Sequence, residues 1–469
     1  MLLSEMRDYG SFSFWLESSG DDLTPRPALD GSIDVDVAIL GAGYTGLWTA
    51  YYLLRADPSL RVALLEREIA GFGASGRNGG WCAPGLNISL TRLAQLHGRE
   101  PARKVYDAVF DAVDEVGRVA AAEDIDINWR RGGELIVSRG PHETPSLEHQ
   151  LRELEEFGFG DRYELLDATG LAERVHIAAG DGALYSPDAA AIHPAKLARG
   201  LARTVERMGA TIYEQTEVTD YQPAGLFSRR PSLSTLVGEV TADVIVLAGE
   251  AYLTSLRRLH RALIPLWSLI VLSEPLPDEV WAEVGWQQYE VIGSPRFTVV
   301  YLSRTIDGRI LFGGRGAPYR FGSPIRDEYD RHGPTHEMLR TLARDWFPQL
   351  RDVKFSHAWG GPLGMPRDWH PRIAFDGGSG MAMAGGYVGH GVSTANLSGR
   401  TLAELITGQQ TSRTELPLVG HRSRAWEPEP FRWIGVRFLQ SALGRVDRLA
   451  EQSGQPPRGR SLEEWLARH

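Results

Sequence analysis

The sequence predicts an α/β fold into which an antiparallel, β-rich second domain is inserted. Three observations lead to this prediction: a complete βαβ unit near the N-terminus, later segments that fit the same sheet, and a β-patterned region between them. With 469 residues, the chain is long enough for two domains and an appendage.

The βαβ unit lies within residues 35–66, about the length that such a unit needs. Residues 35–40 form a short apolar run. Apolar residues then recur at helical spacing over residues 45–56, and residues 61–66 form the next strand.

Segments downstream predict returns to this sheet: a helix over 197–208, a buried strand over 244–248, and a strand over 381–384 followed by a helix over 392–407. Between them, residues 96–190 predict two helical stretches and a strand at 133–137, and residues 262–358 alternate as strands do, for example at 296–301. The predicted organisation is an N-terminal irregular arm (1–30), a discontinuous α/β domain (31–95, 191–261 and 359–419), the inserted domain (96–190 and 262–358) and a C-terminal helical extension (420–469).

The extension contains an apolar stripe. Phe431, Ile434, Phe438 and Leu439 are expected on one face of a helix, with Arg432, Arg437 and Arg445 near the other. Because apolar stripes are usually buried, we expect this face to pack against the enzyme body or a second subunit. A membrane-surface role is the alternative.

Composition narrows the class of protein. Hydrophobic residues make up 42% and charged residues 23%, which is typical of a globular enzyme, and a net charge of -10 argues against a nucleic-acid partner. The single cysteine, Cys82, excludes an internal disulfide and indicates a reducing compartment. No apolar run reaches 18 residues and the N-terminus does not resemble a signal peptide, so we expect a cytoplasmic protein without membrane contact. No metal site is predicted, and the oligomeric state stays open.

The turn Gly41-Ala42-Gly43-Tyr44-Thr45-Gly46 joins the first strand to the first helix. In this context the glycines allow a tight turn, a close approach of the backbone to a pyrophosphate, and close helix packing. Glu66 ends the next strand, where it is expected to accept hydrogen bonds from ribose hydroxyls. The alternative is a glycine-rich turn in an ordinary α/β fold.

A second glycine-rich run follows at residues 71–80, with five glycines in ten residues. Glycine carries an entropic cost in helices and strands, so this run predicts a loop whose backbone lies along a flat ligand, and it favours FAD over NAD. A flexible surface loop is the alternative.

These motifs resemble the FAD-dependent oxidoreductases of the D-amino-acid-oxidase superfamily, in particular the γ-glutamylputrescine oxidase-like branch. The resemblance extends from about Phe14 to Gly408 and includes residues 44–51, 74–80, 192–197 and 385–391. It implies a Rossmann-type FAD-binding domain with an inserted antiparallel substrate domain, as in glycine oxidase, and oxidation of a carbon–nitrogen bond.

The motifs and the resemblance together assign residues to FAD. Near Gly389-His390-Gly391 a helix N-terminus is expected to stabilise the negative charge of reduced flavin. His390 is also a candidate catalytic residue, with Tyr301 and Arg304; its alternative role is to cap a helix or satisfy a backbone carbonyl. The predicted cofactor-binding residues are Gly41, Gly43, Tyr44, Thr45, Gly46, Glu66, Arg67, Gly73, Ala74, Ser75, Gly76, Arg77, Asn78, Gly79, Gly80, Val218, Ala248, Gly249, Gly386, Gly389, His390, Gly391, Val392 and Ser393.

Two departures from the resembling proteins matter. Sarcosine-oxidase-like members have a lysine at the position of Ser393, where it holds a substrate carboxylate. Because this lysine is absent, the sequence predicts an amine substrate that is not held through a carboxylate at this position, unless Arg296 or Arg304 supplies the cation. Residues 357–364 lack the cysteine that tethers flavin in those members, so FAD is expected to be non-covalent, and Cys82 is interpreted as a small buried residue.

The predicted reaction is oxidation of a small primary or secondary amine. Hydride passes to flavin N5, the imine is hydrolysed to an aldehyde or keto product, and oxygen is reduced to hydrogen peroxide. An apolar, aromatic pocket would favour the neutral amine; Trp267, Tyr289, Tyr301, Trp359 and Trp369 are candidates for its walls or for plain core. The alternatives are a D-amino- or imino-acid dehydrogenase that reduces a quinone or carrier protein, and a non-catalytic flavin-binding subunit.

Overall fold

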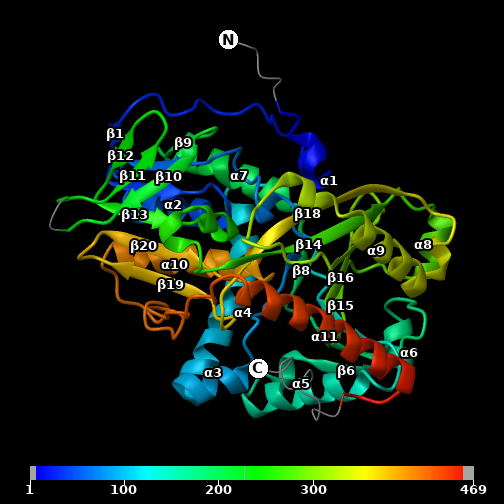
Figure 1. The fold of residues 1–469 in the computed structure, drawn as a ribbon. Coiled ribbons are helices and arrows are strands. Elements are labelled where there is room, and N and C mark those ends of the chain that lie inside the picture. Colours follow the sequence, from blue (N-terminus) through cyan, green and yellow to red (C-terminus); the bar gives the residue numbers. More distant parts are fainter. Residues whose placement is uncertain (1–6, 226–227, 458–469) are drawn as a thin grey trace.

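Two large sheets form the framework of the protein (Figure 1). The structure is a computed structural model that describes residues 7–225 and 228–457. The first sheet has six strands in the order β19-β20-β13-β2-β3-β9, all parallel except β19. Its strands are β2 (Val37–Leu40), β3 (Val62–Leu65), β9 (Thr211–Tyr213), β13 (Val244–Leu247), β19 (Arg372–Asp376) and β20 (Met381–Gly385). The predicted βαβ unit and the two predicted downstream strands therefore all lie in one sheet.

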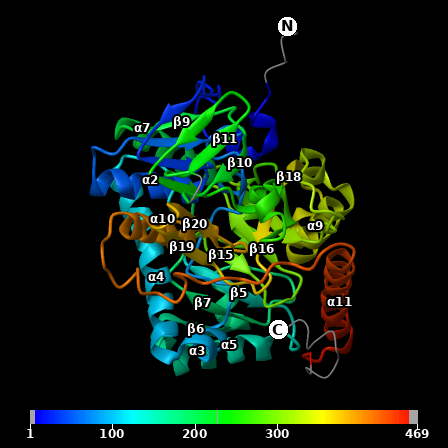
Figure 2. The same cartoon turned by 60° about the vertical axis from the view of Figure 1, so that its left-hand side comes forward.

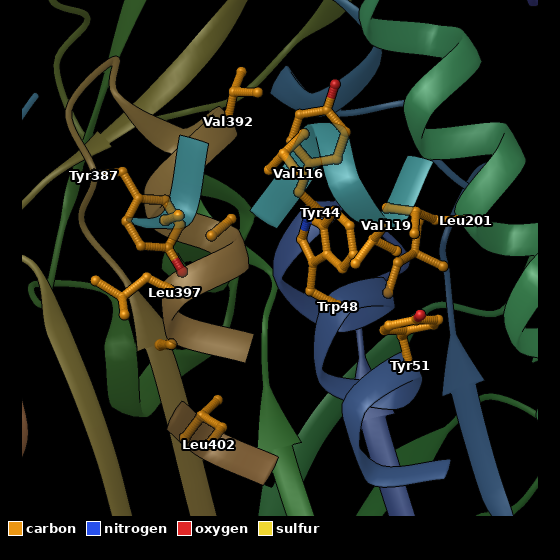
Figure 3. Packing of buried hydrophobic residues seen from close by; sticks show 14 of the residues in the cluster. Tyr44, Trp48, Tyr51, Val116, Val119, Leu201, Tyr387, Val392, Leu397 and Leu402 are labelled. Carbon is orange, nitrogen blue, oxygen red and sulfur yellow. The ribbon is translucent and has the colours of Figure 1, made fainter. Parts of the chain in front are cut away.

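Helices α2 (Tyr44–Ala56) and α10 (Gly391–Ile406) pack against each other on this sheet (Figure 3). Trp48 and Leu47 are fully buried between α2 and its neighbours. A Cβ atom at Gly399 would lie 2.6 Å from the Cβ of Trp48, so only glycine permits this close approach. Helices α4 (Arg99–Ala122) and α7 (Pro194–Arg207) complete the same core. Helix α4 thus belongs to this core, although the predicted boundaries place residues 96–190 in the inserted domain.

The second sheet has eight strands in the order β18-β14-β17-β16-β15-β5-β7-β6. It is antiparallel apart from the parallel pair β5–β15. Helix α9 (Gly333–Trp346) covers one face, which is apolar, and the other face is turned toward the first sheet. The strands are β5 (Glu134–Ser138), β6 (Glu164–Asp167), β7 (Gly182–Ser186), β14 (Ile264–Ser273), β15 (Val291–Gly293), β16 (Val300–Arg304), β17 (Ile310–Arg315) and β18 (Phe355–Met365).

Two details of this sheet differ from the predictions. Strand β18 lies entirely in the second sheet, so the boundary predicted between residues 358 and 359 cuts through a strand. The strand predicted from residue 296 begins only at Val300. The N–H groups of Phe297 and Thr298 instead donate to the carboxylate of Asp447, at 3.1 and 2.7 Å, and so leave the strand ladder.

Smaller elements fill the connections. A four-stranded sheet, in the order β1-β12-β11-β10, lies beside the first sheet (Figure 1), and a two-stranded ladder joins β4 to β8. These strands are β1 (Ile33–Asp34), β4 (Trp81–Cys82), β8 (Ala190–Ala191), β10 (Val218–Gln222), β11 (Ser232–Thr235) and β12 (Glu239–Thr241); the remaining α-helices before the C-terminal extension are α1 (Phe14–Glu17), α3 (Leu90–His97), α5 (Thr144–Glu156), α6 (Ala168–Ala172) and α8 (Asp278–Val284).

The N-terminal arm is more ordered than predicted. Phe14, Trp15 and Leu16 of α1 are buried. The indole N–H of Trp15 donates to the carbonyl of Asn78 at 2.8 Å, which ties the arm to the glycine-rich loop. Residues 1–6 of the predicted arm lie outside the described residues.

The C-terminal helix α11 (Phe431–Ser453) lies at the edge of the molecule (Figure 2). The apolar stripe does not pack against the enzyme body, because Phe431, Ile434 and Phe438 are 69%, 54% and 44% exposed. Its packing against a second subunit, the other part of the expectation, stays a prediction. The buried face instead contains Asp447, which binds the two N–H groups before β16, and Val436, Ala442, Val446 and Ala450. The last twelve residues of the predicted extension, 458–469, lie outside the described part of the chain. Within the described part, no helix combines the length and the apolar character needed to cross a membrane.

Candidate cofactor and substrate site

An elongated cavity of about 420 Å³ separates the two sheets. At one end its walls come from the β2–α2 turn, the end of β3 and residues 216–218. At the other end they come from strands β5, β15, β16 and β17 and from the loop before α10. The cavity therefore connects the predicted nucleotide-binding turn to the second sheet.

The glycine turn leaves space at the N-terminus of α2. Gly41 has φ +100°, and a Cβ atom there would lie 2.8 Å from the carbonyl oxygen of Ala248. At Gly46, a Cβ atom would lie 2.0 Å from the carbonyl oxygen of Gly41. The first N–H groups of a helix have no partner within the helix and point out from its N-terminus, where they favour an anion. Gly43 and Tyr44 line the cavity at this end of α2.

Glu66 lies at the end of β3 and lines the cavity. Its carboxylate accepts the N–H of Ala42 at 2.9 Å and the N–H of Glu68 at 3.0 Å. Burial raises the pKa of this carboxyl group. Each carboxylate oxygen has a second lone pair, which is the acceptor that a ribose hydroxyl needs. Glu66 thus holds the glycine turn in shape as well as facing the cavity.

Hydrogen bonds from the Asn78 side chain fix the conformation of the glycine-rich loop. Its side-chain amide donates to the carbonyls of Ala74 and Ser75, and its amide oxygen accepts the N–H of Gly80 at 2.8 Å. A Cβ atom at Gly79 would lie 2.6 Å from the ring of Tyr301, so this residue must be glycine for the loop to meet β16. The loop lines the cavity through residues 72–75 and 77–79.

Arg77 has a role that the sequence did not indicate. Its guanidinium is 1% exposed and forms an ion pair with Asp330 at 2.5 Å. It also donates to the hydroxyl of Tyr252 at 2.8 Å. The positive charge of Arg77 is therefore paired with the second domain, and this pair fixes the glycine-rich loop against the segment 327–331.

The segment before α10 forms the opposite wall. Gly389, His390, Gly391 and Val392 all line the cavity. Burial, followed by the charge of Arg315, lowers the pKa of His390 to about 4. The imidazole is therefore neutral near pH 7.

Five of the predicted cofactor residues do not reach the cavity wall. The Ser393 hydroxyl is 1% exposed and donates to the carbonyl of Ala83 at 2.7 Å. The N–H of Gly386 donates to the carboxylate of Glu250 at 3.0 Å. The residues outside the lining are Gly46, Gly76, Gly80, Gly386 and Ser393; the other predicted cofactor residues all line the cavity.

Among the catalytic candidates, Tyr301 lies on the cavity wall and Arg304 does not. The Tyr301 hydroxyl lies 2.8 Å from the Ser268 hydroxyl, and burial raises its pKa to about 12. Arg304 lies in a separate small pocket with its guanidinium 3.8 Å from the centre of the Trp281 ring. Arg296 is also elsewhere, paired with Glu451 at 3.1 Å.

The structure adds Arg315, which the sequence reasoning missed. It ends β17 and lines the cavity, and its guanidinium donates to the carbonyl of Val388 at 3.1 Å. Within residues 7–225 and 228–457 it has no carboxylate partner. Burial lowers its pKa to about 10, so it remains charged at neutral pH. Strand alternation places it on the same face as Gly313, which faces Tyr301, and this was the available signal.

Glu250 is a second residue that the sequence did not single out. It follows Gly249 at the end of β13, with φ +47°, and lines the cavity. Burial raises the pKa of its carboxyl group to about 7. The aromatic residues predicted as pocket walls or plain core fall into two groups. Trp267 and Trp359 are core residues. The Trp369 ring instead lies 5.5 Å from the Arg315 guanidinium.

The residues present fit FAD. Glycines 41 and 43 and the N-terminus of α2 form a cradle that side chains would fill, Glu66 offers acceptors, and the cavity is long enough to continue to the second sheet. Across the described residues, no cluster of potential metal ligands is found.

Comparison with known proteins agrees with this geometry. The family described as FAD dependent oxidoreductase matches residues 36–405. Gamma-glutamylputrescine oxidoreductase of Escherichia coli (strain K12) is 30% identical over 399 residues, which cover 84% of this chain and 89% of that protein. The probable oxidoreductase OrdL of Rhizobium meliloti (strain 1021) is 32% identical over 405 residues, with coverage of 85% and 89%.

Among solved structures, glycine oxidase from Geobacillus kaustophilus has a TM-score of 0.68 at 20% identity, covering 83% of this chain and 99% of that one. This similarity confirms the predicted glycine oxidase-like fold, and the match over residues 36–405 covers well over half of the sequence. The chain belongs to the family of FAD-dependent oxidoreductases.

Proposed function

We propose that the protein oxidises the C–N bond of a small primary or secondary amine, with non-covalently bound FAD, and passes the electrons to oxygen. The observation that carries this proposal is the wall formed by Arg315 and His390. It combines a half-buried cation, which has no carboxylate partner among the described residues, with a neutral imidazole. The relatives named above support a nitrogen-containing substrate.

FAD bound in this cavity supplies a two-electron acceptor for the hydride of the substrate carbon. The protein side chains determine the charge of the substrate. A buried cation disfavours a second positive charge nearby, so Arg315 lowers the pKa of a substrate ammonium and favours the neutral amine. Only the neutral amine has the lone pair that drives loss of hydride. No strong side-chain base is needed, and neither the neutral His390 nor the protonated Tyr301 is required to act as one.

Since Ser393 replaces a carboxylate-binding lysine, the sequence predicts a substrate that is not held through a carboxylate. Arg315 changes this expectation. A cation approaches the cavity from β17 instead of from α10, so an anionic group on the substrate has a partner. The proposed substrates therefore include amines that carry a carboxylate.

Non-covalent binding is supported by the position of Cys82. Its side chain is fully buried and is not part of the cavity wall, and burial raises the pKa of its thiol. Since Cys82 is the only cysteine in the chain, no thiol faces the cofactor site.

The test is an anaerobic screen of amines and amino acids for bleaching of the bound flavin, followed by an oxygen electrode. We expect an amine to bleach the flavin, and oxygen to restore the colour with formation of hydrogen peroxide. Bleaching without oxygen consumption would favour a dehydrogenase that reduces a quinone or carrier protein. Flavin that no amine bleaches would contradict the proposal and favour a non-catalytic flavin-binding subunit. Acid precipitation that leaves flavin in the pellet would contradict non-covalent binding.

A further inference from the structure

A second ionisable side chain, Glu134, faces the same cavity on β5. Strand alternation places Leu135 and Val137 in the apolar core on the other face of the sheet, while Glu134 and Ile136 line the cavity. Within the described residues, the Glu134 carboxylate has no hydrogen bond and no ion pair. Burial raises its pKa to about 7.

The other carboxylates of the cavity wall show how unusual this is. Glu66 and Glu250 accept backbone N–H groups, Glu68 pairs with Arg7 at 2.7 Å, and Glu217, which has no such partner in the described part of the chain, is exposed to solvent. Glu134 is half-buried, and a carboxylate that is partly withdrawn from water without a partner costs free energy, so side chains with a purely structural role are usually paired. Since none of the described residues is its partner, we infer that Glu134 pairs with a group of a bound ligand.

The surroundings of Glu134 suit a positively charged alkyl group. Trp81 lines the cavity, and its indole N–H donates to the Leu302 carbonyl at 3.0 Å, which fixes the ring. The ring lies on Gly293, where a Cβ atom would be 3.2 Å from it. Gly293 pairs with Ile136, and Val291 pairs with Glu134, so the ring and the carboxylate occupy adjacent positions on one face of the sheet. A carboxylate beside an aromatic ring is a typical binding site for an ammonium or guanidinium group.

Arg315 cannot be the missing partner, because it lies at the other end of the cavity wall. Strands β16 and β15 separate β17 from β5, which makes three strand spacings, or about 14 Å. Along the strand direction, Arg315 lies opposite Val299, whereas Glu134 is level with Ser303 of β16. Val299 and Ser303 are four residues apart on one strand, which corresponds to about 13 Å. The two Cα atoms are thus roughly 19 Å apart. The two charges need two different groups of a ligand.

We propose that Glu134 and Trp81 form a subsite for a second, positively charged amino or guanidino group of the substrate, remote from the nitrogen that is oxidised. The inference rests on the proposed amine oxidation. It narrows the substrate class to amines with an additional cationic group, such as diamines, and Arg315 is left free for an anionic group.

The test compares α,ω-diaminoalkanes of three to eight carbons with the n-alkylamines of the same length, using the FAD-loaded enzyme. We expect the wild type to prefer the diamine at the best length by about ten- to a hundredfold in kcat/KM, the effect of one charge-assisted contact. Glu134→Gln should lower this preference to about threefold or less, mainly through KM for the diamine, with a much smaller change in kcat/KM for the alkylamines. Glu164→Gln, an exposed carboxylate on β6 of the same sheet, is the matched control and should keep the preference.

A binding measurement separates this inference from the proposed function. The n-pentyltrimethylammonium ion has no nitrogen lone pair, so it cannot be oxidised as an amine, and its binding is read by calorimetry. We expect Glu134→Gln to weaken its binding about fivefold or more. Equal binding to both proteins, or a diamine preference that survives Glu134→Gln, would overturn the subsite. If no amine bleaches the flavin but the ion binds through Glu134, the proposed reaction fails and the cation subsite stands.

Discussion

At the scale of single residues, Gly43 tests whether the cavity end beside α2 holds the pyrophosphate. A Cβ atom at Gly43 would already lie 3.0 Å from the Ser75 hydroxyl, and an aspartate adds negative charge where phosphate is expected. Gly43→Asp should therefore purify folded but without FAD, as read from the flavin absorbance per protein. Gly333→Asp is the control, since a side chain there meets nothing within 4 Å. Normal flavin content in Gly43→Asp would show that the cofactor lies elsewhere.

Arg315 gives a second prediction at this scale. Among the described residues Arg315 is the one cation on its part of the cavity wall, so its replacement by leucine should weaken binding of an anionic ligand by roughly 1.5–3 kcal/mol. Titration of the enzyme with butanoate, followed by the change in flavin absorbance, measures this. Arg315→Lys should recover part of the affinity. Unchanged butanoate binding in Arg315→Leu would mean that the guanidinium serves only the Val388 carbonyl.

At the scale of elements, the Arg77–Asp330 pair joins the glycine-rich loop of the first domain to the segment before α9. The indole N–H of Trp267 also donates to Asp330, at 2.8 Å. Asp330→Ala leaves a buried guanidinium and a buried indole N–H without partners. We expect it to lower the free energy of unfolding by about 3–5 kcal/mol, measured by urea denaturation.

The matched control for this pair is Glu337→Ala. Glu337 is 66% exposed and pairs with Arg340 on the surface of α9 at 3.1 Å. Loss of an exposed pair should change the stability by less than about 1 kcal/mol. Similar losses of unfolding free energy in both variants would show that the buried Arg77–Asp330 pair stabilises the protein no more than an exposed pair does.

The elements also show what the sequence can and cannot predict. The strands β2, β13 and β20 and the helices α2 and α10 were predictable, because apolar periodicity and glycine turns are local signals. The face of α11 that is buried was not. Asp447 turns inward to bind the N–H groups before β16, a contact across about 150 residues that no local pattern reveals. For the same reason Arg315 and Glu134 were missed: each faces the cavity only because distant strands pair.

At the scale of the whole molecule, the pH dependence of stability reflects buried carboxyl groups. The pKa of Glu250 rises from 4.5 to about 7 on burial. The protonated form is favoured in the folded state, so its contribution to stability is complete below pH 4.5 and is lost as the pH rises through 7. Relative to Glu250→Gln, the wild type should lose on the order of 3 kcal/mol of unfolding free energy across this window. Urea denaturation of both proteins at pH 4.5, 6 and 8 measures the difference; a gap that does not change with pH would mean that folding does not raise the pKa of Glu250.

The order of strands in the six-stranded sheet has a consequence for biosynthesis. The glycine turn that follows β2 is made first, yet the neighbouring strand β13 and the next strand in the sheet, β20, are translated about 200 and 340 residues later. The wall that carries His390 leaves the ribosome only when more than four fifths of the chain has been synthesised. A nascent chain cannot enclose the cofactor between both walls until it is nearly complete, so we expect flavin to bind late, after most of the chain has been synthesised.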